Sequence, residues 1–180
     1  NQKAFRLDEP EFRWFYLMFL QALGKYLRYK AELGEIDRYY AHGRASLLAY
    51  ARWMTGHEYP YLSRPERLEY PTETWAAQDI RKVDVFCYAA LLAEADERDT
   101  FLERAAFFHD NSVATLNSMA TRSLARPVIL LLTSGAVLSW FKRNADARMP
   151  IPVEQMRPFH AEAFVPQRKI AERRAMALAA

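Results

Sequence analysis

Two carboxylates in one predicted helix are the chain's candidates for acid/base chemistry. Glu73 stands in the first turn of that helix, and Asp79 follows six residues later. At about 100° per residue, Asp79 falls on the apolar arc of the helix, between Trp75 and Val83. Paired carboxylates are the groups that proton transfer to and from a substrate requires. Glu73 and Asp79 are therefore the predicted catalytic residues.

The same two carboxylates also have structural interpretations, which stay open here. A carboxylate on an apolar arc needs a partner, because burying it alone costs several kcal/mol. For Asp79 we expect an arginine from a neighbouring helix, and the candidates are Arg44, Arg52 and Arg126. Glu73 can serve the helix itself, since a negative charge near a helix amino end stabilises it by ~0.3–1 kcal/mol.

Aromatic and polar side chains surround these carboxylates in the sequence. The proline-rich segment 57–71 contains three tyrosines, and Trp75 follows it. Aromatic faces of this kind can stack against sugar rings, although aromatic residues at a helix start also serve as core. The predicted substrate-binding residues are Tyr61, Tyr70, Trp75, Gln78 and Arg126.

Helical periodicity accounts for most of the chain that must position these residues. Only 5 glycines are present, which argues against a sandwich or a barrel. Acids, prolines and glycines mark helix ends. The predicted helices cover residues 12–33, 37–55, 72–94, a stretch that ends at 117 after a turn at 95–99, and 128–143. The fold class is all-α.

The polarity of the helices predicts how they are layered. The first and fifth helices are apolar almost all round, and the third is intermediate. The second and fourth have a single apolar face. We expect antiparallel helical hairpins in two layers, a partial (α/α) toroid over residues 1–145; a plain helical bundle is the rival. Residues 146–180 form a proline-rich tail with a short terminal helix at 167–176. Because the chain starts at Asn1 and enters a helix almost at once, we expect a fragment of a larger protein.

Alternating helix directions would bring the candidate residues to one end of the molecule. The amino ends of the first, third and fifth helices would meet there, together with the long segment 57–71. Trp14, Trp75, Gln78 and Arg126 all belong to that end. Long irregular segments in compact domains are often functional. This end is therefore the predicted site.

Composition excludes several other classes of function. The net charge of +3 is small and spread among acids, so no nucleic-acid interaction is predicted. One cysteine excludes a disulfide framework, and the four histidines lack metal-ligand spacing. No cofactor and no metal are expected. The strongest apolar run, 127–141, is too short and too interrupted to span a membrane. We expect a cytoplasmic protein.

Two stretches of the chain suggest a family. Residues 60–82, PYLSRPERLEYPTETWAAQDIRK, and residues 121–127, TRSLARP, resemble the carboxy-terminal region of large bacterial proteins of the (α/α)-toroid group. That group includes six-hairpin glycosidases and glucuronyl-epimerase-like domains. The resemblance implies carbohydrate or polysaccharide handling, with a carbohydrate ligand. The alternative is a non-enzymatic helical scaffold or interaction domain.

The number of predicted hairpins indicates whether the chain needs a partner to cover its apolar surface. About three hairpins make half of a closed toroid, which offers one wall of a cleft and leaves apolar helix edges uncovered. We therefore expect weak sugar binding by the isolated chain. We also expect a homo-oligomer, or docking to the rest of a parent chain.

Overall fold

The computed structural model describes residues 10–120 and 124–152 of the chain, and in this part it is helical and without strands. Its α-helices are α1 (Pro10–Glu32), α2 (Arg38–His57), α3 (Glu73–Leu92), α4 (Ala95–Ser118), α5 (Ala125–Ser134) and α6 (Val137–Arg143). Two short 3₁₀ turns, Tyr61–Ser63 and Pro65–Arg67, lie between α2 and α3. The all-α prediction is confirmed. The tail beyond residue 152, with the helix predicted at 167–176, lies outside the described residues.

Local chemistry sets the turn between α1 and α2. Gly34 adopts a left-handed φ of 73°, which a residue without a Cβ reaches at little cost. Asp37 then caps α2, and its carboxylate accepts hydrogen bonds from the backbone amides of Tyr39 and Tyr40 at 3.0 and 2.9 Å. Lys30, near the end of α1, pairs with Asp37 at 3.0 Å. The predicted end of the first helix and the predicted start of the second are each confirmed to within one residue.

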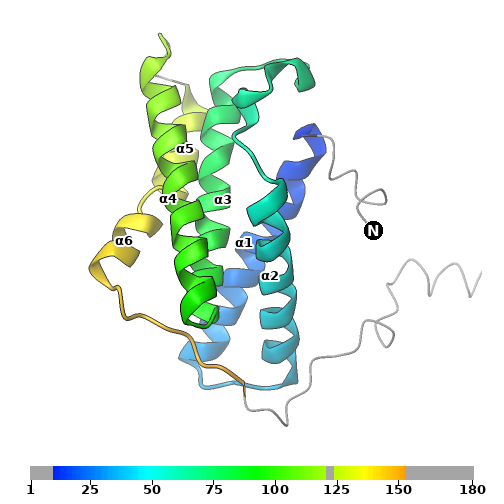
Figure 1. Cartoon of the computed structure of the whole chain (residues 1–180), viewed down its shortest axis with the longest axis vertical. Coiled ribbons are helices and arrows are strands. Elements are labelled where there is room, and N and C mark those ends of the chain that lie inside the picture. Colours follow the sequence, from blue (N-terminus) through cyan, green and yellow to red (C-terminus); the bar gives the residue numbers. More distant parts are fainter. Residues whose placement is uncertain (1–9, 121–123, 153–180) are drawn as a thin grey trace, which may run out of the picture.

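Helix α3 is the centre of the molecule. Helices α1 to α5 alternate in direction (Figure 1), and α3 packs against α1, α2, α4, α5 and α6. Every residue from 76 to 92 except Arg81 is buried. Gly24 allows α1 to approach closely, since a Cβ there would lie 2.4 Å from the Tyr88 ring. The third helix was predicted to be intermediate in burial, and that prediction is wrong.

The first and fifth predicted helices are less enclosed than their composition indicated. On α1, Phe15 and Phe19 are 58% and 55% exposed. The predicted helix 128–143 divides into α5 and α6 around Gly135, and Leu132 on α5 is 77% exposed. The physical reason is that each of these helices packs mainly against α3, so few of the other described helices reach the apolar residues that face away from α3. The predicted turn at 95–99 is also shorter, because α4 begins at Ala95.

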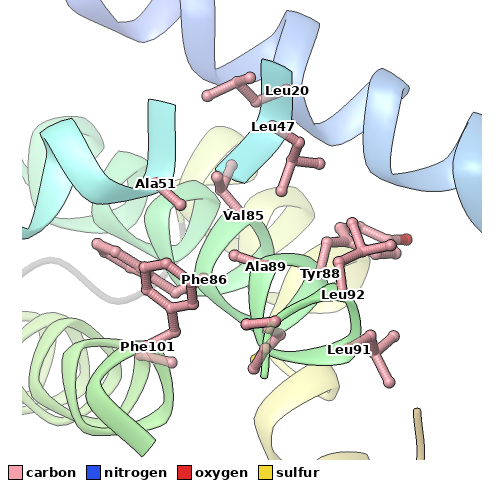
Figure 2. Close-up of a cluster of buried hydrophobic side chains, with 14 of the residues drawn as sticks. Leu20, Leu47, Ala51, Val85, Phe86, Tyr88, Ala89, Leu91, Leu92 and Phe101 are labelled. Carbon is pink, nitrogen blue, oxygen red and sulfur yellow. The ribbon is translucent and has the colours of Figure 1, made fainter. Parts of the chain in front are cut away.

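The core contains residues of α1, α2, α4 and α6 that pack around α3. Figure 2 shows Leu20 of α1 and Leu47 and Ala51 of α2 above α3, with Phe101 of α4 on the far side of Phe86. Phe86 is fully buried, and its ring centroid lies 5.9 Å from that of Phe108 and 6.1 Å from that of Phe101. This packing fixes α4 against α3.

The segment after α6 is tied back onto the helices. Met149 donates its backbone amide to the carbonyl of Leu91 at 2.8 Å, and Tyr40 donates its hydroxyl to the carbonyl of Pro150 at 2.8 Å. Arg98 of α4 donates to the carbonyls of Ala145 and Ala147. This part of the chain is therefore bound along the helix ends rather than projecting from them. In the part of the chain that the structure describes, no helix is long and apolar enough to cross a membrane.

Candidate functional site

A pocket of about 710 Å³ lies where the start of α1, the start of α3 and α5 meet. The residues that give it chemical character are Trp14, Tyr70, Trp75, Gln78, Arg81 and Arg126, and we call it the tryptophan pocket. Its volume falls within the range of small-molecule sites, roughly 300–1,000 Å³. It lies at the end of the molecule that the alternation of helix directions predicts.

The structure brings together four of the five predicted substrate-binding residues. Tyr70, Trp75, Gln78 and Arg126 all line the tryptophan pocket. Tyr61 does not, because it is fully buried behind the pocket wall. Its ring meets Trp75 edge-on, with ring centroids 5.2 Å apart. Tyr61 therefore supports the indole from behind and offers no surface to a ligand.

Backbone contacts hold the aromatic wall in place. The indole nitrogen of Trp75 donates to the backbone carbonyl of Tyr70 at 3.0 Å. The backbone amide of Thr72 donates to the same carbonyl at 2.9 Å. The first turn of α3 is thus joined to the end of the loop. As a result, Tyr70, which is largely exposed, stands at the rim of the pocket beside Trp75.

Arg81 is a pocket residue that the sequence reasoning missed. Its guanidinium donates to the Gln78 side-chain oxygen and to the Gln21 side-chain oxygen, each at 2.7 Å. The Gln21 amide nitrogen donates in turn to a carboxylate oxygen of Asp84 at 2.7 Å. Burial lowers the pKa of Arg81 and raises that of Asp84. This chain of hydrogen bonds holds the Arg81 cation at the pocket wall.

A signal for this network was present in the sequence. Gln21 belongs to the narrow polar line of an otherwise apolar helix, and Gln78 and Arg81 are three residues apart on the polar side of the next inner helix. Residues three apart are neighbours on a helix surface. Only the packing of α1 on α3 shows that these two polar lines face each other.

The predicted catalytic carboxylates do not line the tryptophan pocket. Glu73 is half-buried at the first position of α3. Asp79 is buried, and it accepts hydrogen bonds from the Lys82 ammonium at 2.7 Å and from the backbone amide of Tyr61 at 3.2 Å. Among the residues that the structure describes, none of those lining the pocket is acidic. Its arrangement suits binding, with aromatic faces, amides and guanidinium groups, better than proton transfer.

The predicted arginine partner of Asp79 is wrong, because its partner is Lys82, one turn further along α3. Lys82 is fully buried and also pairs with Glu58 at 3.0 Å. Of the predicted arginines, Arg44 donates to the carbonyl of Leu92, Arg52 pairs with Glu97, and Arg126 lines the pocket. Because α3 is enclosed by the other helices, Lys82 is buried with Asp79 and lies close enough to pair with it, so no arginine from a neighbouring helix is needed.

The buried cluster of Glu58, Asp79 and Lys82 also anchors the loop that precedes α3. Lys82 donates to the carbonyl of Tyr59 at 2.6 Å, and its ammonium lies 3.6 Å from the centre of the Tyr61 ring. The backbone amide of Tyr61 is held by Asp79. One cation and two carboxylates therefore fix the segment that leads to the pocket rim.

Titration of Asp79 predicts a pH dependence of stability. Burial raises the pKa of Asp79 from 3.8 to about 6, against the opposing effect of Lys82. Between pH 4 and 6 the folded chain then binds a proton that the unfolded chain has released, so stability falls as pH rises through this window. Asp79→Asn should flatten this part of the curve in thermal melts recorded across it. A variant with the same slope as the parent chain would contradict the assignment.

A second pocket, of about 450 Å³, lies between α1, α3, α6 and the segment around Met149. Its walls are mainly apolar, with Tyr88, Leu91 and Trp140 among them. Arg28 at this pocket is paired with Glu32 at 2.8 Å. The tryptophan pocket has more polar groups with defined directions, so it is the better candidate site.

Neither pocket shows the signature of a metal centre. Among residues 10–120 and 124–152, no group of three or more histidine, cysteine or acidic side chains is placed to hold a metal ion. Comparison of the chain with protein-family models, with curated proteins and with solved structures finds no match. The function is therefore argued from the geometry of the tryptophan pocket.

Proposed function

We propose that the chain is a carbohydrate-binding helical domain whose tryptophan pocket takes a sugar ring that bears a carboxylate. The observation that carries the proposal is the juxtaposition of Trp14, Tyr70 and Trp75 with two guanidinium groups, those of Arg81 and Arg126. Aromatic side chains offer flat apolar faces to the C–H faces of a sugar ring. A guanidinium matches a carboxylate, because it can donate two parallel hydrogen bonds to it.

The electrostatics of the pocket support an acidic ligand over a neutral one. Arg81 donates to two neutral amides, while the Asp84 carboxylate, which acts on its charge without a direct hydrogen bond, is bound by Gln21 and Ser134 and does not line the pocket. Arg126, which also lines the pocket, is exposed in the first turn of α5. Since none of the described residues that line the pocket is acidic, the two cations together favour an anion.

The proposal is binding rather than catalysis. The two carboxylates that glycosidic cleavage or epimerisation needs are not both available to a ligand, because Asp79 is engaged with Lys82 beneath the surface. The proposal also includes a partial (α/α) toroid of antiparallel hairpins, the group that residues 60–82 and 121–127 resemble. The alternating directions of the helices support that arrangement (Figure 1).

The test is calorimetric titration with a uronic oligosaccharide and with a neutral oligosaccharide of the same length. We expect weak binding of the acidic sugar, in the millimolar range, at least about ten times tighter than that of the neutral one, because a charge-assisted contact adds about 1.5–3 kcal/mol. Arg126→Gln should remove this preference. Tyr70→Ala should weaken the binding of both sugars.

The matched control is Arg143→Gln, which removes an exposed cation at the end of α6, outside the tryptophan pocket. Its binding should equal that of the parent chain. Equal affinity for the acidic and the neutral sugar, or an Arg126→Gln variant that binds like the parent, would rule out the proposed carboxylate site.

A further inference from the structure

Helix α1 presents an apolar stripe to solvent that the tryptophan pocket does not use. Its members are all exposed, and they are Phe15, Phe19, Ala22, Tyr26 and Tyr29 on the helix and Leu33 in the turn directly after its last residue. Ala22 is the only small member, and the other five are between 44% and 61% exposed. Met18 lies beside the row at 44%. We call the six residues the α1 stripe.

The spacing of the α1 stripe is that of helices that pair side by side. Its members are separated by four, three, four, three and four residues. Alternation of four and three keeps a row of side chains facing one partner helix along several turns. The opposite face of α1, with Leu17, Leu20 and Leu27, is already buried within this chain. One helix therefore has two packing faces, of which the core uses one.

The order of the spacings is the same in both directions. A row with this property matches itself when a second copy is turned end for end about the level of Gly24. Phe15 then faces the partner's Leu33, Phe19 faces the partner's Tyr29, and Ala22 faces the partner's Tyr26. Two-fold interfaces require such self-complementarity, because the same patch serves both copies.

The area of the stripe suits a second copy. Aromatic side chains cover about 150–250 Å² each, so five large side chains that are about half exposed leave on the order of 500 Å² of surface per copy. A stable interface takes about 800 Å² from each partner, and other exposed residues beside the stripe can supply the remainder. The stripe is therefore large enough to form most of a two-fold interface.

We propose that the α1 stripe is the interface of an antiparallel homodimer, with α1 of one copy packed along α1 of the other. The single small position fits this role, because a small residue opposite a large one lets the facing side chains interdigitate, here Ala22 with the partner's Tyr26. The interface leaves the tryptophan pocket outside it, with Trp14 at the boundary, where its ring stacks on Phe15 with the ring centroids 4.0 Å apart.

The first experiment measures mass against concentration by light scattering and sedimentation. The parent chain should reach twice the monomer mass. Phe19→Glu should weaken dimerisation by at least about 30-fold, since a central aromatic residue at an interface contributes about 2 kcal/mol or more. The matched control is Leu132→Glu on α5, which places the same charge at a more exposed apolar position and should dimerise like the parent.

The second experiment fixes the direction of pairing by disulfide formation. In the antiparallel dimer, residue 19 lies about 15 Å along the axis from its own counterpart, too far for a disulfide. The double variant Phe19→Cys with Tyr29→Cys should therefore cross-link the two copies, and neither single variant should. The native Cys87 is buried and contributes no background.

Three results would overturn the proposal. A chain that stays monomeric at all concentrations would mean that the stripe is covered by another segment of this chain or by a different protein. Dissociation by Leu132→Glu, with Phe19→Glu still dimeric, would place the interface on α5. Cross-linking by the single variants would show parallel pairing. Circular dichroism should confirm that each exposed substitution leaves the helices folded.

Discussion

Lys82→Met is expected to lower the free energy of unfolding by about 3–5 kcal/mol at neutral pH, because it leaves buried carboxylates without their cation. The Lys82 ammonium lies 2.7 Å from Asp79 and 3.0 Å from Glu58, and all three side chains are buried. Methionine has a similar length and is apolar, so it retains most of the packing of the lysine stem. The loss measured by chemical denaturation therefore reports on the charge.

The matched control is Arg52→Met, which removes the cation of an exposed ion pair with Glu97. Such pairs contribute about 0–1 kcal/mol, so its effect should be small. Lowering the pH should also restore part of the stability of Lys82→Met, because the stranded Asp79 carboxylate, whose pKa is raised by burial, then accepts a proton in the folded state. Equal effects of the two substitutions, or no recovery in acid, would contradict the buried-cluster assignment.

Phe86→Ala is expected to cost about 3–5 kcal/mol, as the loss of a buried aromatic ring leaves a cavity. Phe86 contacts both Phe101 and Phe108 of α4, and it is flanked on the other side by residues of α2 (Figure 2). Close packing in a core prevents its neighbours from filling the space. The measurement is the midpoint of denaturant unfolding at an unchanged slope.

The control for this prediction is Phe107→Ala, the same substitution at a neighbouring position of α4. Phe107 is 44% exposed, so removing its ring should cost about 1 kcal/mol. If both substitutions had similar effects, α3 and α4 would not be held together through Phe86.

The Lys82 cluster links stability to the tryptophan pocket. Lys82 and Asp79 hold the loop at Tyr59 and Tyr61, and the Tyr61 ring supports Trp75 from behind. The position of the Trp75 wall therefore depends on the buried ion pairs that hold the loop beneath it. In this arrangement Asp79 positions the loop through the backbone amide of Tyr61, and it affects the pocket only through that loop.

Local chemistry determined the helical content of the chain and several of its helix ends. Gly34 and Asp37 set the first turn, because a left-handed φ and a capping carboxylate act within a few residues. The alternation of helix directions was also expected from the predicted helical hairpins, and Trp75, Gln78 and Arg126 line one pocket. These features depend on interactions between residues that are close in sequence.

Tertiary packing alone decided the rest. Sequence reasoning named an arginine for Asp79, missed Arg81, and expected uncovered apolar helix edges without identifying Phe15 and Phe19 as residues that form one. Each outcome depends on which helix became the centre. Helical periodicity shows which residues share a face, but the burial of a face is set by the other helices that reach it. Because α3 took the central place, its lysine was turned inward, while the outer face of α1 was left to solvent.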